Sequence, residues 1–137
     1  MSLEKGIRAI LIAESDVTDI VSTRIYPQRR PQGTILPALT YRTVYQEITE
    51  ALAEQTGLRR SRVSIDCADS TYGGNKTLRD AVTSALIDYN DTISNEIIDS
   101  IRLEAAVDID EDLEPASGSV GVFRTILDFI VYHQANA

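Results

Sequence analysis

The stretch "RRSRVSIDC", residues 59–67, decides the fold class because its side chains alternate in character. Val63, Ile65 and Cys67 occupy every second position, and arginine, serine and aspartate fill the positions between them. Successive side chains of an extended chain point to opposite faces. The spacing therefore predicts a β-strand with one buried face and one charged face.

Three other segments share this period of two: residues 37–45, 101–110 and 120–132. Their β-branched and aromatic content also favours strands. In the last two segments the alternation predicts which side chains face the core. The expected inward-facing residues are Ile101, Leu103, Ala105, Val107 and Ile109, followed by Phe123, Thr125, Leu127, Phe129 and Val131.

Helical spacing marks two other parts of the chain. An apolar stripe at intervals of three and four runs through residues 3–11, with a short turn at 17–21, and a longer stripe runs through 75–90. Such stripes predict amphipathic helices. Ser70 or Asn75 is expected to cap the longer helix, whose first turn follows two glycines.

Residues 46–57, "QEITEALAEQTG", allow two interpretations. Local propensity favours a helix that stops at the glycine. The alternative is the tip of a long β-hairpin between two strands. With either interpretation of 46–57, strands and helices in this order predict an α+β domain in which helices cover one face of a sheet. A chain of 137 residues fits a single domain, 1–137.

Composition limits the classes of partner. The formal net charge is −8, which argues against a general nucleic-acid binder because phosphate contacts need clustered cations. No apolar run approaches the length of a membrane helix, and a single cysteine cannot form an internal disulfide. Eleven of the 13 basic residues are arginine, a residue enriched at protein interfaces.

The stretch "STYGGNKTL", residues 70–78, is similar to a phosphate-binding loop but departs from its pattern. The two glycines that such a loop requires fall at Ser70 and Asn75. The acidic run 108–112 is similar to the opening of a calcium loop, yet the required glycine and glutamate positions hold Leu113 and Ser119. We expect no cofactor and no metal ion at either place.

Nucleophilic chemistry also lacks support in the sequence. Cys67 lies on the apolar face of its strand, His133 is the only histidine, and no third residue that would orient such a pair stands out. No serine lies in a G-x-S-x-G pattern. We therefore expect no catalytic residues and no enzymatic activity.

Two arginine pairs remain. Arg29 and Arg30 lie on a proline-rich loop, and Arg59 and Arg60 lead into the strand 59–67. They either form local salt bridges with the 21 acidic residues or meet carboxylates of a neighbouring subunit or partner.

A succession of short motifs in chain order covers nearly the whole sequence. These motifs are "RIYP" (24–27), "PALTY" (37–41), "RVSIDC" (62–67), "TY" (71–72), "IRLE" (101–104), "LEP" (113–115), "VFR" (122–124) and "DFIVYH" (128–133). Together they resemble the phage tail completion proteins, which join the tail to the head in long-tailed phages. Gly73 and Gly74 and the acidic run 108–112 depart from the family pattern.

This resemblance implies a mostly antiparallel sheet with a long hairpin at 46–57, packed against two main helices on one face. It also implies a structural virion protein at the tail–head junction, assembled in the host cytoplasm as a ring of about six copies. The ring would cap the tail tube, bind the tube protein and the head connector, and let DNA pass without specific binding. Repulsion of phosphate would suit acidic residues in its lumen. The candidates are the acidic residues of 47–54 and of 108–114, among them Asp108, Asp110, Glu111 and Asp112.

Two alternatives stay open. The first is another neck or tail-tube component of the same particle. The second is a small metal- or nucleotide-dependent enzyme that uses the glycine turn or the acidic run.

Overall fold

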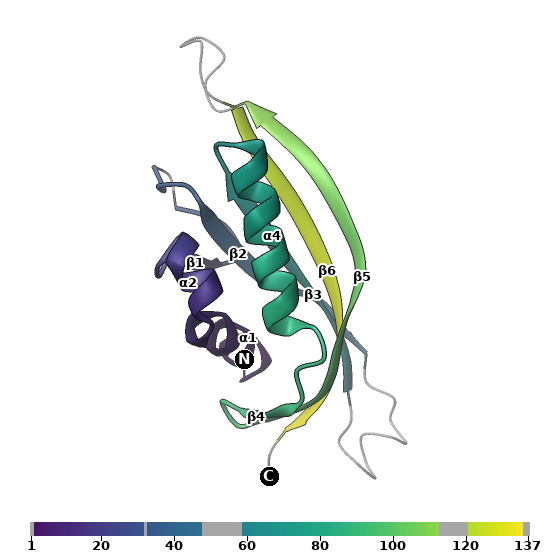
Figure 1. Cartoon of the computed structure of the whole chain (residues 1–137). Helices are drawn as coiled ribbons and strands as arrows, with labels where there is room; N and C mark the ends of the chain where they lie inside the picture. The colour runs from purple at the N-terminus through teal and green to yellow at the C-terminus, as the bar shows by residue number, and fades with distance from the viewer. Residues whose placement is uncertain (1, 32, 48–58, 113–120, 136–137) are drawn as a thin grey trace.

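The computed structural model describes residues 2–31, 33–47, 59–112 and 121–135 (Figure 1). The predicted hairpin tip lies almost entirely in 48–58, outside the described residues. The elements in chain order are α1 (Ser2–Ala13), α2 (Ser15–Val21), β1 (Ile25–Pro27), β2 (Ala38–Glu47), β3 (Arg59–Asp69), α4 (Tyr72–Leu86), β4 (Asp91–Ile93), β5 (Glu96–Asp112) and β6 (Gly121–Ala135).

The six strands form one sheet in the order β1-β2-β3-β6-β5-β4. Short β1 runs parallel to β2, and every other neighbouring pair is antiparallel, so the sheet is mixed. Figure 1 shows that β5 and β6 are long and strongly curved. The predicted α+β class is confirmed.

One apolar core joins the helices to the inner, concave face of the sheet (Figure 1). The predicted stripe of α1 is buried, and α4 contributes Leu78, Val82 and Leu86, each 0% exposed. No helix among the described residues is long and apolar enough to cross a membrane. The strand residues of this core are Leu39, Tyr41, Val63, Ile65, Cys67, Ile98, Ile101, Leu127, Phe129 and Val131.

The alternation predicted for 59–67 is confirmed, since Val63, Ile65 and Cys67 are fully buried. On the outer face, Arg62 pairs with Asp128 of β6, with 3.2 Å between Nη2 and Oδ2. Ile130, its register partner on β6, is also buried although it lies on the outer face. The aliphatic stems of neighbouring arginines are suited to covering such a side chain.

The alternation predicted for 101–110 is wrong beyond Leu103. β5 shifts register against β6 between Ile98 and Ser100 and again between Leu103 and Ala105. A bulge inserts one residue and exchanges the faces of every side chain that follows. Val107 and Ile109 consequently lie on the outer face, 51% and 37% exposed.

β2 shows the same effect. Leu39 and Tyr41 are buried in the core, but the register against β3 shifts between Thr43 and Tyr45. The predicted alternation fails there, and Tyr45 is 41% exposed.

The start of α4 also differs from the prediction. Neither Ser70 nor Asn75 caps it; Thr71 does, because its Oγ1 accepts a hydrogen bond from the Gly74 N–H at 3.1 Å. The helix begins at Tyr72, earlier than predicted, and ends at Leu86.

Candidate assembly interface

The loop 28–37 between β1 and β2 carries Arg29, which is exposed, and Arg30, which is half-buried. The Gln28 N–H donates to the Tyr41 carbonyl at 3.0 Å, and the Thr34 N–H donates to the Pro31 carbonyl at 3.2 Å. Prolines fix φ, so a loop with proline at both ends and in its interior loses little conformational freedom on binding.

Arg24 closes the base of this loop. Its Nε donates to the Pro37 carbonyl at 2.9 Å, and its own carbonyl accepts from the Leu39 N–H at 2.9 Å. Its Nη2 also reaches the Ile20 carbonyl, at 3.3 Å. Arg24 thus ties α2, β1 and β2 together and fixes the loop. The sequence motif "RIYP" contains Arg24 but does not reveal this role.

A groove of about 700 Å³ lies beside the loop. Its charged side chains are Arg29 and Arg30 of the loop, Asp66 of β3 and Arg124 of β6. The Arg124 Nε donates to both oxygens of Asp66, at 3.0 and 3.3 Å. The exposed guanidinium of Arg29 at this groove suits a carboxylate from another chain.

The other predicted arginines lie elsewhere. Arg59 and Arg60 begin β3, and Nη1 of Arg60 donates to the hydroxyl of Tyr45 at 3.2 Å. Asp66 in the groove follows Arg60 by six residues, which is ~20 Å along an extended strand. The structure does not bring the two arginine pairs into one site.

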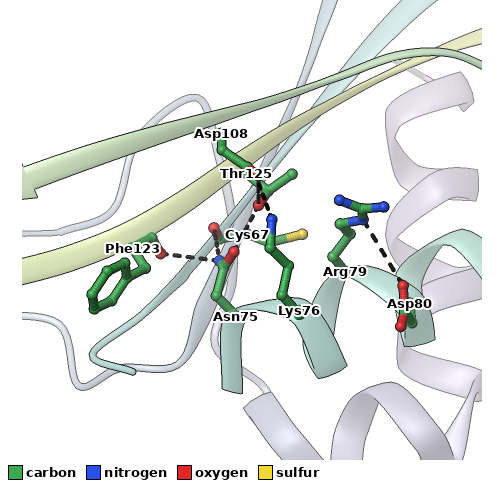
Figure 2. Close-up of polar contacts among 8 residues, drawn as sticks. All are labelled: Cys67, Asn75, Lys76, Arg79, Asp80, Asp108, Phe123 and Thr125. Atoms are coloured by element: carbon green, nitrogen blue, oxygen red, sulfur yellow. Dashed lines mark hydrogen bonds and ion pairs between the residues drawn. The ribbon is translucent and has the colours of Figure 1, made fainter. Parts of the chain in front are cut away.

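Asp108 is paired within the chain. Its Oδ2 lies 2.5 Å from the Lys76 Nζ, and its Oδ1 lies 2.8 Å from the Thr125 Oγ1 (Figure 2). The hydrogen bond from Lys76 lowers the pKa of the Asp108 carboxyl below its ordinary value of 3.8, and the Thr125 hydroxyl adds to this effect. The positive charge of Lys76 offsets the negative charge of Asp108. Asp108 is therefore a weaker candidate for a residue of an acidic lumen.

The rest of the acidic run belongs to strand β5 by its backbone. Asp110, Glu111 and Asp112 are register partners of Phe123, Val122 and Gly121 in β6. Their side chains lie outside the described part of the structure.

Asn75 holds the first turn of α4, which contains Gly73 and Gly74, in place. Its Nδ2 donates to the carbonyls of Cys67 at 2.8 Å and Phe123 at 3.0 Å, and its Oδ1 lies 2.6 Å from the Thr125 Oγ1 (Figure 2). A single buried amide therefore fastens the first turn of α4 to β3 and β6.

Ser61, His133 and Glu96 form a buried chain of hydrogen bonds that the sequence did not reveal. The Ser61 Oγ lies 2.7 Å from Nε2 of His133, and Nδ1 of His133 meets Oε2 of Glu96. The order is that of a hydrolase triad, but all three residues are buried and Ser61 is 0% exposed. A substrate cannot reach Ser61 Oγ in this conformation.

Burial also raises the pKa of the Cys67 thiol.

The fold places the chain in the α+β class, and the charged groove lies beside the loop 28–37. The family model for tail completion protein gp17 matches residues 5–133, and the chain belongs to that family. It is a structural protein of the phage tail.

Comparison with solved structures gives the same fold. A chain of the virion of a native gene transfer agent particle matches with a TM-score of 0.69 and 18% sequence identity. The match covers 98% of this chain and 96% of that chain. No curated protein matches the sequence.

Proposed function

We propose that this protein completes the tail by forming a ring of six copies at the head-proximal end of the tube. The ring caps the tube protein and offers its other side to the head connector, and DNA passes through without specific binding. The role is mechanical and requires no catalytic step. The family match over residues 5–133 carries the proposal.

The fold match supports a place in the virion. The similar chain belongs to a gene transfer agent virion, and its fold extends over nearly the whole of both chains. We infer from this that the protein remains in the finished particle, at the junction of tail and head, after assembly in the host cytoplasm.

The groove supports a protein–protein contact at the loop 28–37. Arg29 is exposed, and the loop that carries it is tied at its base by the contacts of Arg24. A preordered cationic loop binds a carboxylate of the next subunit, or of the connector, at low entropic cost. Arg59 and Arg60 would then serve a separate contact, because they begin the opposite end of β3.

The acidic balance of the chain suits a lumen through which DNA slides. With Asp108 paired to Lys76, the remaining candidates on β5 are Asp110, Glu111 and Asp112. A basic lumen in an assembled ring would contradict this part of the proposal.

Electron microscopy of tails made without the protein tests the role. Capping predicts overlong or open-ended tubes that do not join heads. Normal tubes with a defect elsewhere in the neck would instead assign the protein to another neck component, and unassembled tubes would make it a tube component.

Reversal of Arg29 and Arg30 to glutamate tests the loop. The double variant is expected to fold as the parent does, yet to lose ring formation or head joining. Reversal of Lys5 and Arg79, which lie in α1 and α4, provides a control with the same charge change. Full head joining by the Arg29/Arg30 variant would exclude the loop as an interface.

A further inference from the structure

The two flanks of the sheet carry opposite charge. Residues 24–47, which comprise β1, the loop and β2, hold four arginines and one glutamate, a formal charge of +3; we call them the basic flank. Residues 88–112, which comprise β4 and β5, hold nine acidic residues and one arginine, a formal charge of −8; we call them the acidic flank. The acidic flank alone equals the net charge of the whole chain.

These flanks are the two ends of the sheet, because the strand order runs from β1-β2 to β5-β4. The charge separation therefore lies across the sheet, from one end to the other. In Figure 1, β5 forms one long border of the molecule, and β1 and β2 lie on the opposite side of β3 and β6.

Each flank has a length of strand without a strand partner among the described residues. β1 pairs with β2 only as far as Tyr41, which leaves 42–47 as an edge. β4 pairs with β5 only as far as Ile98, and the Asp88 N–H reaches the Ile101 carbonyl, which leaves 102–112 as the other edge. An unpaired edge is a natural docking place for another chain.

Exposed apolar side chains lie on both edges. On β2, Val44 is 48% exposed and Tyr45 is 41% exposed. On β5, Val107 and Ile109 point away from the core after the second bulge. Each edge thus offers apolar area to bury as well as charge.

Charge decides which edges can meet. Two acidic flanks would place the exposed carboxylates of one copy against those of the other, and the two bulges in β5 further disfavour regular pairing of that strand with itself. An acidic flank against a basic flank is attractive. We propose that the acidic flank of one copy docks on the basic flank of a second copy, in a head-to-tail contact that closes into a ring.

This inference rests on the proposed ring and names the two surfaces that build it. A contact between two different patches repeats around a rotation axis, whereas a contact of a patch with itself ends at a dimer. The exposed carboxylates available for the contact include Asp91, Asp99 and Glu104. On the opposite flank, Arg29 and Arg42 are exposed.

The experiment uses two variants of the full chain with opposite defects. In the first, Asp99→Lys and Glu104→Lys replace two exposed carboxylates of the acidic flank with cations; in the second, Arg29→Glu and Arg42→Glu replace two exposed cations of the basic flank with carboxylates. The control, Asp19→Lys with Asp80→Lys, has the same charge change as the first variant but lies on α2 and α4. Circular dichroism checks that each protein is folded.

Each protein is added to tail tubes assembled without it, and rings are counted by electron microscopy and by cross-linking. Parent and control are expected to form rings, and each variant alone to form at least about tenfold fewer, because like charges then face each other at the reversed positions. An equimolar mixture is expected to recover rings, since alternating copies place the new lysines of one variant against the new glutamates of the other.

The remaining outcomes contradict the proposal in separable ways. If the parent forms rings and either variant alone forms them equally well, the flanks do not meet, although the ring function stands. If the folded variants fail both alone and mixed, the flanks are not partners of each other. If the parent itself forms no ring on tubes, the proposed function fails and this inference fails with it.

Discussion

His133 and Glu96 meet inside the sheet, where Nδ1 of the imidazole contacts a carboxylate oxygen and both side chains are at most 5% exposed. They join β6 to β5, and Ser61, which contacts Nε2 of the same imidazole, extends the contact to β3. Three neighbouring strands are thus tied by one polar chain at the end of the sheet where β3 begins. Buried polar groups of this kind are costly when one partner is removed.

Substitution of Glu96 by alanine is expected to destabilise the fold by about 3 kcal/mol, because it leaves a buried imidazole nitrogen without its partner. Ser61→Ala is expected to cost about 1 kcal/mol. Chemical denaturation measures both. Glu104→Ala, at an exposed position of the same strand, serves as the control. A Glu96→Ala variant as stable as this control would show that the buried chain contributes nothing.

Asp108 gives a pH-dependent contribution with a defined sign. Its pKa in the folded state is lowered, so the stabilisation is complete above the ordinary value of 3.8 and is lost as pH falls through the lower folded value. The side chain is 55% exposed, so screening limits the effect to about 0.5 kcal/mol.

The measurement compares the free energies of unfolding of parent and Asp108→Asn from pH 7 down to pH 2. The gap between them is expected to narrow below pH 3.8. Lys76→Gln removes the main cause of the shift and is expected to reduce the gap at neutral pH. A gap that stays constant across the range would contradict the pairing.

Gly73 and Gly74 are neighbours with opposite expected responses to alanine. A Cβ at Gly73 meets no atom within 4 Å, whereas a Cβ at Gly74 meets the side chains of Asp69 and Thr71. Gly73→Ala is expected to stabilise the helix by about 0.5 kcal/mol. Gly74→Ala is expected to destabilise it by about 1–3 kcal/mol because the cap must move. Thermal unfolding of the two variants decides this, and shifts in the same direction would contradict the cap geometry.

The sequence predicted those parts of the fold where one period holds over a whole element. The alternation of Val63, Ile65 and Cys67 and the stripe of α4 both matched the observed burial. The prediction failed where a bulge adds one residue to a strand. Nothing in the composition of β5 marks its two bulges, so Val107 and Ile109 were assigned to the wrong face.

The candidate site was predictable only in its local parts. Arg29 and Arg30 were recognised from the proline-rich loop. Their neighbours were not, because Asp66 and Arg124 are 58 positions apart and meet only through the register of β3 and β6. The same holds for Ser61 and His133, 72 positions apart. A sequence pattern does not encode such pairings until the strand order is known.

The central claim is that copies of this chain form a closed ring between the tail tube and the head connector. A cryo-electron microscopy reconstruction of the tail–head junction tests it most directly. We predict a closed ring of this chain there, with the acidic β4–β5 flank of each copy against the basic β1–β2 flank of the next. A single copy at the junction, or a ring of this chain at another position in the particle, would contradict the account.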